Sequence, residues 1–245
     1  MRRNIVLCGY HWAGCKALEM LLRAGNEVYV YTHKSQNGIA DLEGFCKKKG
    51  IGYTFEKISM DNLPYKPDVI CSIYYRYIIS REVIDAVEGK IFNLHPSLLP
   101  EYRGCSSLTW ALINGERECG FTYHYIDEGC DTGNIIIQKD IKIEEFDTQL
   151  TLYHKVMFEG MSYFEDALEK VLSGDRGVPQ TGIGSLYKRG CPLNGELTDD
   201  MDDEFQERFV RAMIYPPYPS ASYKGSTIET LAELEQMKST WGDNL

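Results

Sequence analysis

The sequence predicts an α/β fold in which a mostly parallel sheet is covered by helices. In the first 95 residues, short apolar runs rich in Val, Ile and Tyr alternate with segments whose apolar residues recur at helical spacing. Glycine closes several of the helical segments, as is typical of helix C-termini. This β-α-β-α order favours a parallel sheet, whose ligands bind beside the carboxyl ends of the strands.

Each element follows from a local pattern. The strands of the first part are expected at residues 4–8, 27–31, 68–75 and 90–93. The helices between them are expected at residues 14–24, 41–49 and 81–87. Farther along, we expect a helix at 106–114, strands at 119–126 and 134–141, and one long helix at 148–173 with Gly174 just past its end.

The 245 residues allow one large domain with an appendage. We expect a core domain at residues 1–185 and a small β-containing C-terminal subdomain at residues 186–245, with hairpin-like strands around residues 216–228. Residues 196–207 carry seven acidic side chains and no basic one, which is typical of a solvated face or of a helix start.

Composition excludes several classes of protein. The chain has 26 Lys and Arg against 36 Asp and Glu, and the net charge of −10 opposes binding to nucleic acid or to an anionic membrane. The N-terminus reads as a first strand and not as a signal peptide, so we expect a cytoplasmic protein. The eight cysteines form no C-x-x-C pair, which predicts free thiols in a reducing compartment and no metal site.

Asn93 and His95 end a predicted strand, directly before Pro96. Residues two apart in a strand point the same way, so both side chains should lie on one rim at the strand's carboxyl end. The Asn amide can hold a developing oxyanion, and the His ring, which titrates near neutrality, can move a proton. Together these groups favour an acyl-type transfer.

Residues 126–134 hold three acidic residues and two glycines, a pattern typical of a polar turn between strands. They do not match a calcium-binding EF-hand loop, because the twelfth residue from Asp127 is Gln138 and not Glu. We expect Asp131 to lie beside His95 and to set its protonation, while a plain hairpin remains the alternative.

A glycine-containing loop at residues 9–16 joins the first strand to the first helix. Its backbone N–H groups could hold a phosphate, or the segment could be an ordinary tight turn. It is not a Walker A loop, because Cys15 separates Gly14 from Lys16, and it lacks the G-x-G start of a dinucleotide-binding loop. A hydride-transferring enzyme is therefore disfavoured.

The motif N-x-H-P-S-L-L-P-x-Y-R-G at residues 93–104, followed by D-E-G-x-D-T-G at residues 127–133, resembles the formyltransferases that use N10-formyltetrahydrofolate. The resemblance covers roughly residues 4–170 and continues more weakly to R-A-M-I-Y-P-P-Y-P at residues 211–219, which is similar to the sugar-modifying members. It implies a Rossmann-like formyltransferase core, N10-formyltetrahydrofolate as co-substrate, and a homodimer formed through the C-terminal strands.

The resemblance also implies roles for individual residues. The catalytic trio would be Asn93, His95 and Asp131. The folate would contact Tyr77, Ile78, Ile79, Leu98, Asp127, Glu128 and Gly129. The acceptor substrate would contact Gly9, Tyr10, His11, Trp12, Arg76, Arg103, Arg211, Tyr215 and Tyr218. The two C-terminal tyrosines would stack on a nucleobase, or else form a strand edge or a dimer contact.

Among the acceptors of such enzymes, a nucleotide-linked amino sugar fits best, and in particular a dTDP-amino-dideoxyhexose for surface polysaccharide or O-antigen synthesis. Glycinamide ribonucleotide and methionyl-tRNA are alternatives, but a tRNA needs a basic surface that the net charge of −10 opposes. A non-catalytic folate or nucleotide-sugar binding module is the alternative from another class, although such a module has no need of all three catalytic side chains.

Overall fold

The computed structural model describes residues 2–35 and 40–242 of the chain. The chain divides into two compact units. The first unit consists of residues 1–95, 121–139 and 157–183, and the second of residues 96–120, 140–156 and 184–245. Both units are therefore built from segments that lie far apart in the sequence.

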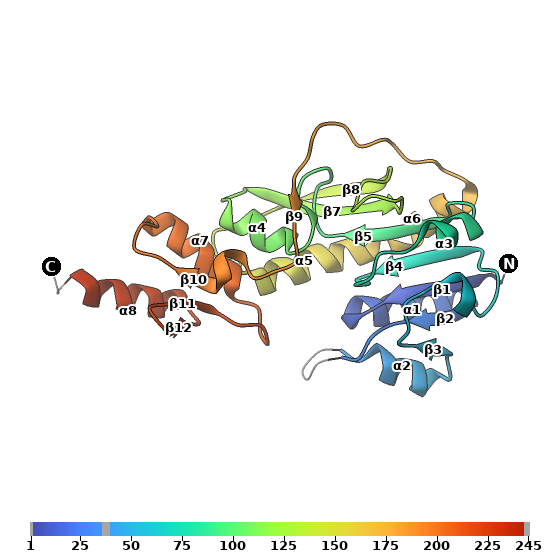
Figure 1. Cartoon of the computed structure of the whole chain (residues 1–245), viewed down its shortest axis with the longest axis horizontal. Helices are drawn as coiled ribbons and strands as arrows, with labels where there is room; N and C mark the ends of the chain where they lie inside the picture. The colour runs from blue at the N-terminus through green and yellow to red at the C-terminus, as the bar shows by residue number, and fades with distance from the viewer. Residues whose placement is uncertain (1, 36–39, 243–245) are drawn as a thin grey trace. The chain divides into compact units, whose positions relative to one another are not determined.

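A seven-stranded sheet forms the centre of the first unit, with the order β3-β2-β1-β4-β5-β7-β8 (Figure 1). The strands are β1 Asn4–Gly9, β2 Glu27–Tyr31, β3 Tyr53–Thr54, β4 Val69–Ile73, β5 Ile91–His95, β7 Glu118–Tyr125 and β8 Ile135–Lys142. The five strands from β3 to β5 pair in parallel, whereas β7 pairs antiparallel with β5. The predicted α/β fold with a mostly parallel sheet is confirmed.

The helices that follow these strands are amphipathic or short. They are α1 His11–Arg23, α2 Leu42–Lys49, α3 Arg81–Ala86, α5 Gln149–Ser162 and α6 Phe164–Ser173, with a 3-10 turn η1 at Met60–Asn62. Gly174 adopts a left-handed φ of 85° and ends α6, as the sequence predicts. The strands bury residues such as Val6, Ile70 and Ile91 completely, and these form the core of the unit.

The predicted helix at residues 148–173 is wrong, because the chain forms two helices that meet at Tyr163. The carbonyl of Gly160 accepts a hydrogen bond from the Tyr123 hydroxyl at 2.9 Å and from the N–H of Tyr163 at 3.1 Å. Gly160 also lies so close to Leu94 and Phe121 that an added Cβ would stand 3.2 and 3.3 Å from their side chains. The break therefore results from packing against the sheet, which the helical pattern does not encode.

The first helix also begins earlier than predicted. Helix α1 starts at His11 and not at residue 14, so most of the expected glycine loop is the first turn of a helix. The N–H of Gly14 donates to the carbonyl of Tyr10 at 3.0 Å inside that turn. An added Cβ on Gly14 would stand 3.0 Å from the Leu42 side chain, so this glycine permits close packing of α1 on α2.

The second unit contains more helix than the sequence predicted. Its helices are α4 Ser107–Ile113, α7 Asp203–Met213 and α8 Leu231–Gly242, with a 3-10 segment η2 at Pro192–Gly195. Its strands are β6 Arg103–Gly104 paired with β9 Leu186–Tyr187, and a small sheet of β10 Glu196–Leu197, β11 Ala221–Tyr223 and β12 Ser226–Ile228. Strands β11 and β12 form an antiparallel hairpin, within the region where hairpin-like strands were expected.

The acidic segment of the second unit begins a helix. The Asp202 carboxylate accepts a hydrogen bond from the Phe205 N–H at 2.7 Å and caps α7. Asp203 and Glu204 follow in the first turn, where negative charge is stabilised by the helix dipole. All seven acidic residues of this segment are exposed, so it is both a solvated face and, from Asp202 onward, a helix start.

All eight cysteines are free thiols, and Cys8, Cys46, Cys71 and Cys119 are buried. Within residues 2–35 and 40–242, no helix combines the length and the apolar character needed to span a bilayer.

Candidate active site

Asn93 and His95 lie on β5, at the carboxyl edge of the parallel part of the sheet. Strand β5 is flanked by β4 and β7, which place Ser72 and His124 directly opposite Asn93 on its two sides. The His95 side chain is 5% exposed. The two predicted side chains therefore share one rim, and their orientation is controlled by both neighbouring strands.

The structure brings Asp131 to this rim from the segment between β7 and β8. One carboxylate oxygen, Oδ2, lies 3.6 Å from Nδ1 of His95, and the other, Oδ1, lies 3.4 Å from Nε2 of His124. The Asp131 side chain is 17% exposed, whereas both histidines are almost fully buried. A carboxylate placed between two imidazoles can accept a hydrogen bond from a ring N–H or take up a proton during the reaction.

Hydrogen bonds within the segment fix the position of Asp131. The Gln180 amide donates to the carbonyls of Asp131 and Gly133, both at 2.8 Å. The Asp127 carboxylate accepts from the Gly129 N–H at 3.0 Å and from the Thr132 hydroxyl at 2.6 Å. Asp131 itself has a left-handed φ of 55°, which is uncommon for a residue with a side chain. The predicted polar turn is thus tied down by hydrogen bonds on both sides of Asp131, whose carboxylate faces the two histidines.

Asn93 is held at both ends of its side-chain amide. The Ser72 hydroxyl donates to Oδ1 at 3.1 Å, and Nδ2 lies 3.1 Å from Nε2 of His124. His124 and Gln180 were not singled out from the sequence, and the contact of Ser72 with Asn93 was not predicted. His124 and Ser72 stand at strand positions whose partners are known only once the strands are paired, and Gln180 lies in a loop without a recognisable motif.

The predicted folate-binding residues of the first unit lie in two loops. Tyr77 and Ile78 follow β4 and are 37% and 74% exposed, whereas Ile79 is buried. The second loop contains Asp127, Glu128 and Gly129. The Arg81 guanidinium, at the start of α3, lies 3.5 Å from the Glu128 carboxylate and connects the two loops.

Tyr10, a predicted acceptor-binding residue, lies at the topological switch point, where β1 lies between β2 and β4. The Tyr10 N–H donates to the Ile73 carbonyl at 3.1 Å and joins the ends of β1 and β4. The Tyr10 ring stacks on His33 with 3.7 Å between ring centroids and faces Tyr74 at 6.3 Å. The ends of three neighbouring parallel strands therefore carry aromatic rings in contact with one another.

The other four predicted acceptor-binding residues of the first unit have contacts of their own. His11 lies against Tyr74 at 5.7 Å between ring centroids, and Trp12 lies against Phe158 at 4.5 Å. The Arg76 guanidinium lies 5.5 Å from the centre of the Tyr77 ring. Gly9 ends β1, and an added Cβ there would stand 3.3 Å from the Leu42 side chain, so its lack of a side chain serves packing.

The remaining predicted residues belong to the second unit. Arg211 donates to the Asp147 carbonyl at 3.0 Å, and its side chain is only 11% exposed. The structure therefore gives Arg211 contacts inside this unit, where the sequence suggested contact with substrate. Tyr215 and Tyr218 stack on each other with 5.4 Å between ring centroids, and Tyr218 is 45% exposed. Arg103 lies half-buried in β6.

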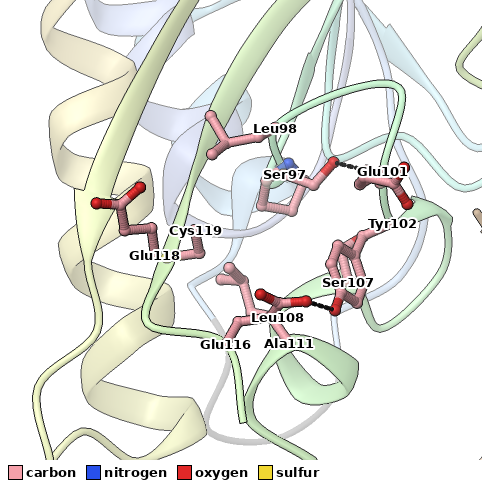
Figure 2. Close-up of a pocket in the computed structure, with 11 residues that line it drawn as sticks. Ser97, Leu98, Glu101, Tyr102, Ser107, Leu108, Ala111, Glu116, Glu118 and Cys119 are labelled. Atoms are coloured by element: carbon pink, nitrogen blue, oxygen red, sulfur yellow. Dashed lines mark hydrogen bonds between the residues drawn. The ribbon is translucent and has the colours of Figure 1, made fainter. Parts of the chain in front are cut away.

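Leu98 lines a cavity of about 130 Å³ in the second unit, together with Ser97, Tyr102 and Leu108 (Figure 2). The Tyr102 hydroxyl donates to the Glu116 carboxylate at 2.5 Å at one side of this cavity (Figure 2). In the part of the chain that the structure describes, no group of three or more His, Cys, Asp or Glu side chains is placed to hold a metal ion.

Comparison with known proteins assigns this fold and site to a family. Residues 46–168 match the family model described as formyl transferase. The GDP-perosamine N-formyltransferases of Brucella melitensis and Brucella abortus are each 34% identical to this chain over 229 residues, which is 90% of this chain and 88% of theirs.

Solved structures share the fold. The sugar 3N-formyl transferase WlaRD, solved with dTDP and 5-N-formyl-THF, has a TM-score of 0.80 at 24% identity and covers 94% of this chain and 85% of its own. The N-formyltransferase of Helicobacter canadensis, solved with folinic acid and dTDP-3-aminofucose, has the same TM-score and identity and covers 94% and 87%. Because the family model spans half of the sequence and the Brucella relatives exceed 30% identity over nine-tenths of it, the chain belongs to the formyl transferase family and is an N-formyltransferase.

Proposed function

We propose that this enzyme transfers the formyl group of N10-formyltetrahydrofolate to the primary amine of a nucleotide-linked amino sugar. The observation that carries the chemistry is the meeting of Asn93, His95 and Asp131 at one strand end, with Asp131 3.6 Å from His95. An amide donor, an imidazole and a carboxylate on one rim are the groups that formyl transfer to an amine requires.

Each of the three residues has a role in this proposal. The Asn93 amide and the His95 ring hold the negative charge that develops on the formyl oxygen as the unprotonated amine attacks. Asp131 and His95 carry the proton from the amine to the leaving nitrogen. The separations of 3.6 and 3.4 Å around Asp131 exceed those of strong hydrogen bonds, and such contacts often shorten when substrate binds.

The folate is proposed to bind between the loop after β4 and the loop at residues 127–129. Exposed Tyr77 and Ile78 offer apolar surface to a flat ring, and backbone groups near Ile79 offer hydrogen bonds to its edge. The exposed Arg81 and Glu128 side chains lie 3.5 Å apart, so the two loops are neighbours, which supports this arrangement. Relatives with this fold have been solved with 5-N-formyl-THF and with folinic acid.

The nucleotide sugar is proposed to dock at the aromatic cluster of Tyr10, His33 and Tyr74, at the switch point of the sheet where α/β proteins bind ligands. Relatives at 34% identity are GDP-perosamine N-formyltransferases, which favours a GDP-linked sugar. A dTDP-linked sugar, as the sequence suggested, is the second candidate, because the structures at 24% identity hold dTDP ligands. We further propose that the enzyme is a homodimer, that it is located in the cytoplasm and that its product is used in surface polysaccharide synthesis.

A panel of acceptors tests this proposal. The enzyme is incubated with N10-formyltetrahydrofolate and with GDP-perosamine, dTDP-3-aminofucose or a UDP-linked amino sugar, and mass spectrometry detects a formyl group in place of one amine hydrogen. We expect turnover with the GDP- or the dTDP-linked sugar. Binding of folate and sugar without any transfer would support the non-catalytic module instead.

Three variants test the residue roles. Asn93→Ala, His95→Asn and Asp131→Ala should each lower kcat by about 100- to 1000-fold, with folate affinity nearly unchanged. Asp61→Ala, which removes an exposed carboxylate of the first unit, is the matched control and should retain wild-type turnover. Near-normal turnover in all three site variants contradicts the assignment.

A further inference from the structure

Ser72, Asn93 and His124 form a continuous row across three neighbouring strands. The register pairs Ser72 on β4 with Asn93 on β5, and Asn93 with His124 on β7. Cross-strand partners in a sheet place their side chains on the same face, so the three polar groups meet in line. Ser72 and His124 are 4% and 2% exposed, so water does not compete strongly for their hydrogen bonds.

The direction of every hydrogen bond in this row follows from one backbone carbonyl. Nδ1 of His124 lies 2.7 Å from the carbonyl oxygen of Tyr125, which can only accept, so Nδ1 carries a hydrogen. In the neutral ring Nε2 then has a lone pair and accepts a hydrogen bond, and the group 3.1 Å away must be the NH₂ of Asn93. Asn93 Oδ1 consequently faces Ser72, whose hydroxyl donates to it at 3.1 Å.

Nε2 of His124 also lies near the Asp131 carboxylate, and the distances decide between the two partners. The separation from Asn93 Nδ2 is 3.1 Å, whereas that from Asp131 Oδ1 is 3.4 Å, which is beyond the usual range for a hydrogen bond from a ring nitrogen. Nε2 of His124 therefore accepts its hydrogen bond from the NH₂ group of Asn93.

We infer that His124 is a positioning residue that fixes the rotation of the Asn93 amide. With Oδ1 taken by Ser72 and one Nδ2 hydrogen taken by His124, the second Nδ2 hydrogen is left to donate to the formyl oxygen. Without His124, the amide can turn its oxygen toward the developing negative charge, which is repulsive. This inference rests on the proposed formyl transfer, in which Asn93 is a donor.

Two substitutions at position 124 separate positioning from mere packing. His124→Leu keeps a similar volume and removes the acceptor. It should lower kcat by about 10- to 100-fold, which is less than the loss expected when Asn93 itself is removed, because a misaligned amide still stabilises the oxyanion in part. His124→Gln can still accept from Asn93 through its side-chain carbonyl and should stay within about fivefold of wild type. KM for both substrates and folate affinity should change little in either variant. His154→Leu, which removes another histidine that donates to a backbone carbonyl, is the matched control and should keep wild-type kcat.

A double-mutant cycle and a spectroscopic measurement complete the test. If His124 acts through Asn93, His124→Leu should have no further effect on kcat in the Asn93→Ala background. Nitrogen chemical shifts of the His124 ring should show the hydrogen on Nδ1 and the lone pair on Nε2. Equal loss of kcat in the Leu and Gln variants, additive effects in the cycle, or a neutral ring protonated on Nε2 would each overturn the inference.

Failure of the proposed function gives a different result, namely no transfer by the wild-type enzyme to any acceptor. The position of the ring hydrogen on His124 is measured without substrate, so the hydrogen-bonded row is tested even in that case. Thermal unfolding of each variant identifies loss of kcat that comes only from loss of folded protein.

Discussion

Gly133 is the residue where a single methyl group should disable the proposed site. An ideal Cβ built on Gly133 would stand 1.9 Å from the carbonyl oxygen of Tyr125 and 2.7 Å from its carbon. Real Cβ atoms essentially never approach closer than 3.0 Å, so Gly133→Ala must separate the loop from β7 by about 1.1 Å, the difference between 3.0 and 1.9 Å. Both clashing atoms belong to the backbone, and no side-chain rotation relieves the contact.

The displacement reaches the reacting groups because Asp131 is only two residues away. The hydrogen bonds from Gln180 to the carbonyls of Asp131 and Gly133, both 2.8 Å, would be strained together with that from the Tyr125 N–H to the Asn134 carbonyl. Misplacement of a catalytic group by about 1 Å can cost roughly 100-fold in rate. We therefore expect Gly133→Ala to lower kcat by about 100-fold and the stability by about 1–3 kcal/mol.

The assay is formyl transfer followed by mass spectrometry, with thermal unfolding measured on the same preparation. Gly190→Ala is the matched control, because a Cβ at Gly190 would meet nothing within 4 Å, and it should match wild type in both measurements. A kcat of Gly133→Ala within threefold of wild type would refute the claim that this loop fixes Asp131 at the site.

Two further predictions concern stability and thiol chemistry. Asp147→Ala should lower the free energy of unfolding by about 2–3 kcal/mol, because it removes a carboxylate that is 3% exposed and lies 2.9 Å from the half-exposed Lys155 ammonium. Arg2→Ala, which breaks an exposed ion pair, is the control and should lower it by less than about 0.5 kcal/mol. Burial alone raises the pKa of Asp147, but hydrogen bonds from a backbone N–H and from Lys155 outweigh it and hold the pKa below its usual 3.8. The Asp147 carboxylate therefore contributes its full stability above pH 3.8, and this contribution is lost as the pH falls through the lowered pKa of the folded state. When unfolding is measured at decreasing pH, the stabilities of the wild type and Asp147→Ala should converge below pH 3.8. A thiol reagent should modify exposed Cys130 in the folded enzyme but should reach Cys71 only after unfolding, because burial raises the pKa of that thiol; early labelling of Cys71 in a peptide map would contradict the described core.

Local patterns in the sequence predicted most of the sheet. Strand β2 was predicted at its observed bounds, and β1, β4, β5, β7 and β8 differ from prediction by two residues or fewer at each end, because buried strands leave continuous apolar runs that end at turn residues. Helix α8 was missed, and the prediction of a β-containing C-terminal part was incomplete. The break at Tyr163 was missed because it depends on Gly160 packing against β5 and β7.

The sequence by itself determined that Asn93 and His95 face the same side, since the two-residue period of a strand is a local property. The sequence also led us to expect Asp131 beside His95, but only the tertiary structure decided the other contacts: His124 lies opposite Asn93 through the register of two antiparallel strands, and Gln180 holds the loop that carries Asp131. Likewise, the resemblance implied contact of Arg211 with the acceptor substrate, while packing directed its guanidinium to the Asp147 carbonyl. The physical reason is that side-chain direction follows from backbone period, whereas partners distant in sequence depend on the pairing and packing of the whole chain.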